Sequence, residues 1–432
     1  KLHPLTSDFT FGYCTLQQSD EPLSLLNMMI FRNKKLSFRI KKKKSKKSSG
    51  DECIEKTTCS DSSGSLLNHS RHVKTRELNG PDLQPNVNYT EKYCKCVMVT
   101  GGVGFVGSHV VETLLQEGRK VVIYDIFNSE TSKSDEKKRI ANLLKQVAED
   151  NSHHGASLNI VTGDIRDQKK IMETVEEHGV TGCIHVGGMV DDRRSVAFPD
   201  EYISVNILGT AKLLDALGKS GVKMVVQAST RSIFGQRSNN DEVLDEGADR
   251  RPINPYGASK VGADAMAHCY SHLHNMNLTL VRIFATYGPR GRPDMMPRIL
   301  IESIVNDKPI PKFGDGTATR TWIYVLDIVS AFLTALKHPQ GGFAEFNTGA
   351  HNSTTLNKLI DAAEVVTGKK AIIEHHPAPP GDAHTVGHPN YDKIQKVLGW
   401  TPKVSLMEGM RMTYEDYMLT QQIDSSKQRV EK

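Results

Sequence analysis

A short apolar run that enters a turn with three glycines is the feature that most constrains this chain. The run is Cys96–Thr100, and the turn after it carries glycines at positions 101, 104 and 107 before the helix-like segment Ser108–Leu115. A second apolar run, Lys120–Asp125, follows that segment. Apolar runs that alternate with helix-like segments predict a parallel sheet covered by helices, so we expect a doubly wound α/β fold.

The glycine positions suit a backbone that must approach a phosphate group closely. Gly101 permits the tight turn, Gly104 lets the backbone come near a pyrophosphate, and Gly107 lets the helix pack on the strand. Asp125 stands about 20 residues further on, where a carboxylate accepts hydrogen bonds from an adenosine ribose. Because no basic residue immediately follows Asp125, the pattern predicts a Rossmann-type site for NAD rather than NADP.

A second pattern, Tyr256-x-x-x-Lys260, lies far downstream of the glycine turn. A free tyrosine has a pKa near 10 and is a poor base at neutral pH. A lysine ammonium one helical turn away, beside a positively charged nicotinamide ring, favours the phenolate. We therefore predict that Tyr256 is a general base, assisted by Lys260 and by the hydroxyl of Thr230 at the end of the preceding strand. The alternative for this pair is a surface helix that starts after a proline.

The chain divides into four predicted parts. Residues 1–92 are basic and Ser-rich and are expected to be disordered. The NAD-binding domain is predicted over 93–287, a mainly nucleotide-sugar-binding lobe over 288–417, and a polar tail over 418–432. Within the NAD-binding domain, further strands are expected at 158–162, 183–186, 224–227 and 279–284, with helices at 136–148, at 202–217 and from Tyr256 onward.

Composition bounds the size of the core and the possible partners. A chain of 432 residues that is 38% hydrophobic can bury one large core, or a core plus a smaller domain. Much of the formal net charge of +5 comes from the lysine run 41–47. That run is typical of a nuclear signal or of a patch for anionic surfaces, but a solvated block in a disordered tail is the favoured interpretation. No nucleic-acid partner is expected.

Localisation signals are weak. The apolar patch Leu23–Phe31 is too short to span a bilayer, and no convincing signal peptide precedes it. The chain begins at Lys1 rather than Met, so we expect a fragment or a processed product. Seven scattered cysteines indicate reduced thiols and a cytoplasmic protein. The spacing of His375, His376, His384 and His388 fits no standard zinc pattern, so no metal is expected.

As a set, these residues resemble the extended short-chain dehydrogenase/reductase superfamily, and more narrowly its NAD-dependent nucleotide-sugar epimerases and dehydratases. The resemblance covers about 95–417. It also rests on Asn206, Arg282-x-Phe284, Gly314-Asp315-Gly316, Asp327, Asn347-x-Gly349 and Pro380-Gly381-Asp382. It implies a UDP-sugar substrate and a homodimer that pairs through two long helices, one starting at Tyr256. It further implies cofactor contacts at Phe105, Val106, Asp164, Ile165, Gly187 and Gly188, and nucleotide contacts at Arg320 and Asp382.

One segment narrows the resemblance further. Tyr287–Met295 reads Tyr-Gly-Pro-Arg-Gly-Arg-Pro-Asp-Met and is similar to the corresponding segment of UDP-glucuronate 4-epimerases, which implies that Arg292 lies on the substrate side. Sugar dehydratases of the family carry an Asp-Glu pair directly after the threonine, whereas this chain has Arg231 and Ser232. Elimination would lack its proton shuttle, so the resemblance favours a 4-epimerase that interconverts UDP-glucuronate and UDP-galacturonate.

Three departures from the family pattern keep other functions open. Gly187 and Gly188 replace two alanines, and Asp191 with Asp192 replaces Gly-Val before Arg193. Ala285 replaces a threonine that is expected to contact the sugar carboxylate. Arg193, Arg194 and Arg231 are candidates to supply compensating positive charge. The alternatives are a UDP-hexose 4-epimerase, another NAD-dependent sugar-nucleotide oxidoreductase, or an NAD-binding sensor or scaffold that has lost turnover.

Overall fold

The computed structural model of the chain describes residues 94–127, 133–238, 242–350, 352–377 and 386–430. The predicted disordered region 1–92, the lysine run 41–47 and the patch Leu23–Phe31 therefore lie outside the described residues. So does Asp382, which the resemblance assigned to the nucleotide.

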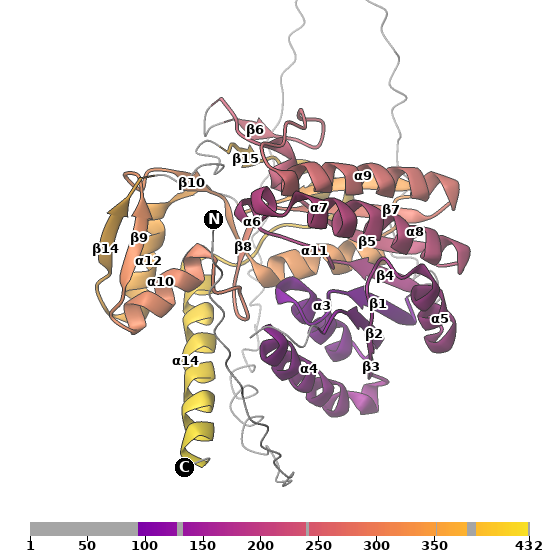
Figure 1. Cartoon of the computed structure of the whole chain (residues 1–432), viewed down its shortest axis with the longest axis horizontal. Coiled ribbons are helices and arrows are strands. Elements are labelled where there is room, and N and C mark those ends of the chain that lie inside the picture. Colours follow the sequence, from indigo (N-terminus) through magenta and orange to yellow (C-terminus); the bar gives the residue numbers. More distant parts are fainter. Residues whose placement is uncertain (1–93, 128–132, 239–241, 351, 378–385, 431–432) are drawn as a thin grey trace, which may run out of the picture. The chain divides into compact units, whose positions relative to one another are not determined.

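A seven-stranded sheet forms the centre of the described chain (Figure 1), and every neighbouring pair of its strands is parallel. The strand order is β12-β7-β5-β4-β1-β2-β3. The inner strands read as near-continuous apolar runs because helices cover both faces of the sheet. The bounds are β1 (Cys96–Thr100), β2 (Lys120–Asp125), β3 (Ser157–Thr162), β4 (Gly182–His185), β5 (Met224–Thr230), β7 (Asn277–Ile283) and β12 (Phe343–Thr348). The predicted doubly wound α/β fold is confirmed.

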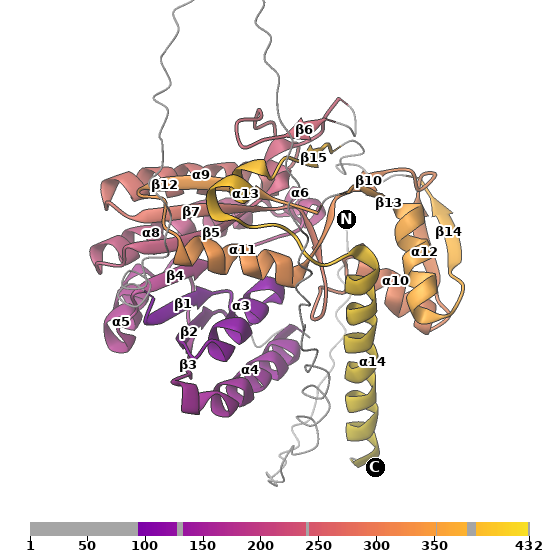
Figure 2. The same ribbon diagram turned by 180° about the vertical axis from the view of Figure 1, so that it is seen from behind.

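Two layers of helices enclose this sheet (Figures 1 and 2). On one face, α3 (Phe105–Gln116), α4 (Lys133–Asp150) and α11 (Val325–Lys337) bury their apolar side chains in a common core. On the other face, α5 (Gln168–His178), α8 (Thr210–Lys219) and α9 (Pro255–Leu273) form a second core. The order in which successive strands are added to the sheet reverses between β1 and β4, so the loops after these two strands open a crevice at the carboxyl edge of the sheet.

A smaller lobe has its own apolar core, which includes Leu300, Leu359, Met410 and Tyr417. It contains the helices α10 (Met296–Val305), α12 (Leu356–Thr367) and α14 (Leu406–Val430). Its short strands pair as β9 (Pro309–Phe313) with β14 (Ile372–His376), and β10 (Thr319–Arg320) with β13 (Thr354–Thr355).

The structure differs from the predicted division of the chain in two places. Segment 288–417 was assigned mainly to the smaller lobe, but α11, β12 and α13 (Asp392–Leu398) return to the large sheet. Their apolar side chains complete one face and one edge of that sheet, which local sequence could not indicate. The expected polar tail from 418 continues α14 as far as Val430.

The predicted helix 202–217 is also not one regular helix. It consists of α7 (Pro199–Tyr202), the π-helix η2 (Ile203–Gly209) and α8. Single π turns inside α-helices are frequent at functional sites, and this one carries Asn206. The remaining elements are η1 (Ser152–His154), α6 (Asp192–Ala197), η3 (Arg231–Phe234), β6 (Val243–Leu244), β8 (Ala285–Tyr287), β11 (Trp322–Tyr324) and β15 (His388–Pro389). Among the described helices, none combines the length and apolar character needed to cross a bilayer.

Candidate active site

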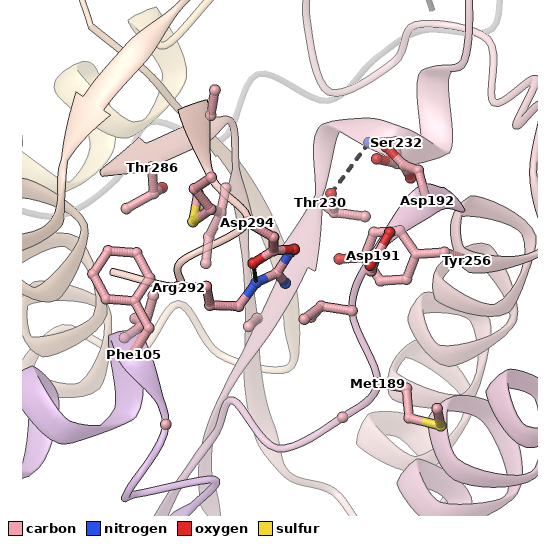
Figure 3. A pocket seen from close by; sticks show the side chains of 18 of the residues that line it. Phe105, Met189, Asp191, Asp192, Thr230, Ser232, Tyr256, Thr286, Arg292 and Asp294 are labelled. Atoms are coloured by element: carbon pink, nitrogen blue, oxygen red, sulfur yellow. Dashed lines mark hydrogen bonds and ion pairs between the residues drawn. The ribbon is translucent and has the colours of Figure 1, made fainter. Parts of the chain in front are cut away.

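A cavity of about 1550 Å³ opens at the carboxyl edge of the large sheet and extends to the smaller lobe. Every site residue predicted from the sequence that the structure describes lines this cavity; Asp382 is the one outside the described ranges. The glycine turn, the Tyr-x-x-x-Lys pair and the arginines from distant parts of the sequence are thus brought together. Figure 3 shows part of its lining, with Phe105 and Arg292 facing Tyr256 and Thr230.

The glycine turn is sterically required at two positions. Gly101 has φ +68°, and a Cβ there would lie 2.8 Å from the Cα of Gly187 in the loop after β4. A Cβ on Gly107 would lie 2.1 Å from the carbonyl oxygen of Gly101. Two loops from neighbouring strands therefore touch at the crevice, and α3 starts directly behind them with its N–H groups toward the cavity.

Asp125 ends β2 at the rim of the cavity and is almost fully buried. Its Oδ2 accepts a hydrogen bond from the backbone N–H of Val103 (3.2 Å), which ties the glycine turn to β2. Its Oδ1 lies 2.7 Å from Nζ of Lys137 on α4. Lys137 also lines the cavity, so the structure places a cation beside Asp125 that the sequence argument missed. The sequence carries no signal for this pair, because Asp125 and Lys137 are 12 residues apart and belong to different elements, β2 and α4.

Asp164 and Ile165 follow β3 on the same side of the cavity. Arg166 forms an ion pair with Asp164, and hydrogen bonds from this guanidinium lower the pKa of the Asp164 carboxyl. Arg166 Nη1 also donates to Ser204 Oγ (2.9 Å) on η2. The loop after β3 is thereby fastened to the π-helix on the other side of the crevice.

His185 at the end of β4 connects neighbouring elements beside the glycine turn through hydrogen bonds. Its Nδ1 lies 2.7 Å from Thr100 Oγ1, and its Nε2 lies 3.1 Å from Thr210 Oγ1. The backbone N–H of Gly187 donates to the same Thr100 hydroxyl at 3.1 Å. Burial lowers the pKa of His185 to about 3, with the nearby Lys260 ammonium as the second cause. His185 is therefore a neutral linker between β1, β4 and α8.

Asn206 holds the loop after β4 in place. Its Oδ1 accepts from the N–H of Met189 (2.8 Å), and its Nδ2 donates to the carbonyl of Met189 (2.9 Å) and to Ser259 Oγ (2.9 Å). The π turn of η2 directs this side chain between the loop and α9. The loop that carries Gly187 and Gly188 is thus fixed relative to the helix that carries Tyr256 and Lys260.

Tyr256 and Lys260 lie in the first turns of α9, which begins at Pro255 with Asn254 as its cap: Asn254 Oδ1 accepts from the N–H of Gly257 (2.8 Å). Burial raises the pKa of Tyr256 to about 12. A hydrogen bond with the Thr230 hydroxyl opposes this rise, and the Asp192 carboxylate adds to it. Thr230 and Tyr256 thus lie side by side in the cavity, and the role of Thr230 toward a reacting oxygen stays a prediction.

Lys260 is held by a backbone hydrogen bond. Its Nζ donates to the carbonyl of Ala228 at 2.8 Å, and burial lowers its own pKa. Burial is the largest cause of the raised pKa of Tyr256. That Lys260, together with a bound nicotinamide, favours the Tyr256 phenolate stays a prediction. Behind Lys260, buried Asp264 accepts from Ser229 Oγ (2.8 Å) and interacts with Lys260.

The substrate side of the cavity carries several charges. Arg292 forms two hydrogen bonds with Asp294, from Nε (2.9 Å) and from Nη2 (2.7 Å), which Figure 3 shows in the middle of the cavity. Arg320 Nη1 donates to the carbonyl of Thr319 (2.9 Å). Arg193 and Arg231 line the cavity as well. Asp294 was missed as a lining residue, although it lies two positions after Arg292.

The residues that depart from the family pattern line the cavity. Ala285 lines the cavity, and the neighbouring Thr286 donates to the carbonyl of Phe284 (3.1 Å). Asp191 and Asp192 lie at the start of α6 on the wall that carries Tyr256 (Figure 3). Asp191 has φ +102°, an uncommon conformation for a residue with a side chain. The two added acids therefore belong to the cavity rather than to the outer surface.

The parallel sheet, the glycine turn at its switch point and the buried Tyr-Lys pair define a dinucleotide-binding oxidoreductase fold of the short-chain type. A family model described as GDP-mannose 4,6 dehydratase matches residues 98–413. The chain therefore belongs to this family of NAD-dependent sugar-nucleotide epimerases and dehydratases, part of the extended short-chain dehydrogenase/reductase superfamily.

Individual relatives point to epimerases. The chain is 33% identical over 319 residues to a UDP-glucuronate 4-epimerase of Thermodesulfobacterium geofontis, a match that covers 73% of this chain and 94% of that protein. Its structure is similar to that of UDP-glucuronic acid 4-epimerase from Bacillus cereus in complex with UDP-glucuronic acid and NAD, with a TM-score of 0.66, 27% identity, and 75% and 99% of the two chains covered. UDP-glucose 4-epimerase from Thermotoga maritima with UDP-glucose gives a TM-score of 0.66 at 28% identity, with 75% and 99% covered.

Proposed function

We propose that this protein is an NAD-dependent UDP-sugar 4-epimerase, with UDP-glucuronate and UDP-galacturonate as the first candidate pair. The observation that carries the proposal is the arrangement of Tyr256 and Thr230 in one cavity with the glycine turn, while positions 231 and 232 carry Arg and Ser. This set suffices for oxidation and re-reduction at one carbon. It lacks the carboxylates at 231 and 232 that the dehydratases of the family use for elimination.

The residues present fit NAD. Glycine at 101 and 107 lets the turn pack closely against the loop after β4 and against α3, because a Cβ at either position would clash with backbone. The same turn lines the cavity, where a pyrophosphate can meet the N–H groups at the start of α3. Asp125 presents carboxylate oxygens at the end of β2 for a ribose. Phe105, Val106 and Ile165 line the cavity nearby, together with Asp164, Gly187 and Gly188. When bound, NAD would take up and return hydride at the sugar C4, and its cationic nicotinamide would favour the Tyr256 phenolate.

The side chains of the cavity then have distinct tasks. Tyr256 takes the proton from the C4 hydroxyl and returns it after the 4-keto sugar has turned its other face to the site. Thr230 donates a hydrogen bond to the reacting oxygen. Lys260, anchored on the carbonyl of Ala228, keeps its ammonium next to the cofactor ribose. Arg320 and Arg193 are assigned to the diphosphate, and Arg292 and Arg231 to the sugar side.

A neutral hexose is the second candidate substrate. Ala285 offers no hydroxyl to a sugar carboxylate, and Asp294 already accepts hydrogen bonds from Nε and Nη2 of Arg292, which leaves fewer of its donors for the sugar. Asp191 and Asp192 add negative charge on the opposite wall. UDP-glucose and UDP-galactose therefore form the competing pair, while the arginine-rich lining and the UDP-glucuronate epimerase relatives support the hexuronates.

Two further features complete the proposal. We assign the protein to the cytoplasm because its cysteines are scattered; the four in the described ranges, Cys94, Cys96, Cys183 and Cys269, are free thiols.

A homodimer is proposed through α9 and a neighbouring long helix, with exposed apolar residues such as Leu273 and Leu208 available for contact. Sedimentation velocity tests the dimer.

The test of function is to incubate the purified protein with UDP-glucuronate and, separately, with UDP-glucose, without added cofactor. Chromatography then identifies UDP-galacturonate or UDP-galactose. The Tyr256→Phe variant, which keeps the ring but loses the phenol, is the matched control and should form neither product. Tight NAD retention with no turnover of either sugar would instead identify a nucleotide-binding sensor or scaffold.

A further inference from the structure

Asp192 has a carboxylate oxygen without a donor among the described residues. Its Oδ1 is buried from solvent and accepts no hydrogen bond there, which is unfavourable for a charged group. The side chain as a whole is only partly buried, and it lines the cavity on the wall of Tyr256 and Thr230 (Figure 3). A hydroxyl in the cavity can therefore donate to this carboxylate, whose two oxygens exchange places by rotation about the terminal torsion.

Two sets of nearby donors bond to other carboxylates. The guanidinium of Arg292 donates to Asp294 through Nε and Nη2. The first backbone N–H groups of α6, those of Arg193 and Arg194, donate to Asp191 Oδ1 at 2.9 and 3.2 Å. Asp191 thus caps the short helix, and Asp192 is left to point into the cavity.

The backbone around Asp192 is held in a costly conformation. Asp191 has φ +102° and ψ +106°, and such conformations persist where surrounding structure enforces them, often at active sites. The phenol of buried Tyr202 provides that support, because it donates to the carbonyls of Val190 (2.8 Å) and Asp191 (3.1 Å). Tyr202 also packs edge-on against Tyr256, with ring centroids 6.2 Å apart. The position of Asp192 is therefore coupled to that of the catalytic tyrosine.

We propose that Asp192 is a specificity-determining residue that accepts a hydrogen bond from the sugar C3 hydroxyl, next to the carbon that Tyr256 serves. The inference rests on the proposed 4-epimerase function. C3 is chosen because its hydroxyl adjoins C4 and is common to UDP-glucuronate and UDP-glucose, so the assignment holds for either candidate pair. Asp192 replaces the valine that the family pattern has here, and a valine cannot accept this bond.

The test measures ligand binding by calorimetry in the Tyr256→Phe background, in which turnover does not intervene. The ligands are UDP-glucose and UDP-glucuronate with their 3-deoxy analogues, and the variants are Asp192→Ala and Asp192→Asn. A bond to a buried charge stabilises by roughly 1.5–3 kcal/mol, so removing the C3 hydroxyl should weaken binding about 10- to 100-fold when Asp192 is present. Asp192→Ala should reduce that ratio to within about threefold, while Asp192→Asn, which keeps an acceptor oxygen, should retain part of it.

Asp200→Asn is the matched control, because it removes an exposed carboxylate from the same segment outside the cavity. It should leave the discrimination unchanged, and NAD content and thermal unfolding verify that each variant is folded. A discrimination ratio that Asp192→Ala does not alter would overturn the proposal, as would equal binding of the 3-deoxy analogues by the Asp192 protein. If the sugars bind and discriminate as expected but the protein with Tyr256 intact forms no epimer, the proposed function fails while the role of Asp192 in binding stands.

Discussion

Lys137 Nζ lies 2.7 Å from Asp125 Oδ1, so the acidic residue that ends β2 carries its own counter-ion from α4. The Lys137 side chain is partly exposed, whereas Asp125 is 7% exposed. A carboxylate alone would repel the 2′-phosphate of NADP, but the ion pair places the Lys137 ammonium beside Asp125, where it could attract that phosphate. We therefore predict that selection of NAD over NADP depends on the ion pair by which the Asp125 carboxylate neutralises the charge of Lys137.

Replacing Asp125 by Asn should relax cofactor selection. The lysine would be free to meet a 2′-phosphate, and we expect the affinity for NADP relative to NAD to rise about tenfold, or about 1.4 kcal/mol. Adding Lys137→Met should reverse the gain, whereas Lys138→Met, an exposed neighbour with 67% of its side chain accessible, should not. Dissociation constants for NAD and NADP, measured on protein freed of bound cofactor, test this expectation. A gain in NADP affinity that survives Lys137→Met would contradict this account.

The charge of Asp192 should be visible in the pH dependence of catalysis. Burial raises the pKa of Tyr256 to about 12; among the charged groups around it, Asp192 raises it further and Arg292 lowers it. Removing the carboxylate with Asp192→Asn stabilises the phenolate, so the rise of kcat/KM with pH should move to lower pH. Profiles of the parent, Asp192→Asn and Asp200→Asn proteins provide the check. A shift to higher pH would show that Asp192 does not face the phenol.

The strain at Asp191 predicts a stabilising substitution. Its φ of +102° costs a residue with a side chain about 1–3 kcal/mol, while glycine at a helix cap costs only a few tenths. After the larger chain entropy of glycine is subtracted, Asp191→Gly should raise the free energy of unfolding by about 1 kcal/mol. Urea denaturation measures it, with Asn275→Gly as control because asparagine tolerates its φ of +49°. A loss of stability in Asp191→Gly would mean that the hydrogen bonds of its side chain outweigh the strain.

Because His185 is buried in its neutral form, the fold should lose stability in acid as this side chain becomes protonated. Burial holds its pKa at about 3 in the folded protein, against about 6.5 in the unfolded chain. Because the folded-state pKa is depressed, its contribution is present above pH 6.5 and is lost as the pH falls toward 3, by up to about 1.4 kcal/mol per pH unit. The free energy of unfolding, measured by denaturation at pH 7.5 and at pH 5, should differ less between the two pH values for His185→Gln than for the parent. His153→Gln, at an exposed position, should behave like the parent.

The sequence predicted the large sheet and most of the cavity because those signals are local. The glycine turn, Asp125 and the Tyr256 pair each sit at the end of a strand or the start of a helix, and parallel strands bring such ends together. The contacts that the sequence did not predict join segments that belong to different elements. Lys137 reaches Asp125 from another helix, and α11 joins the large sheet from within a segment assigned to the smaller lobe.

The protonation state of Tyr256 could not be predicted from the sequence either. Spacing indicated a lysine one turn from Tyr256, but the depth of burial sets the pKa, and burial is a property of the whole fold. The same is true of the π turn at Asn206, which depends on contacts among the loop after β4, η2 and α9. Asp192 was identified as a departure, yet only the structure placed it on the wall of Tyr256.

The proposed function requires epimerisation at C4 by oxidation and return of hydrogen within one site. To test it, UDP-glucuronate and, separately, UDP-glucose are labelled with deuterium at C4 and supplied without added cofactor, and NMR locates the label in the product. We expect a C4 epimer from at least one sugar with deuterium retained at C4, and no epimer from Tyr256→Phe. Epimer that has lost the label to solvent, or absence of epimer from both sugars, would contradict it.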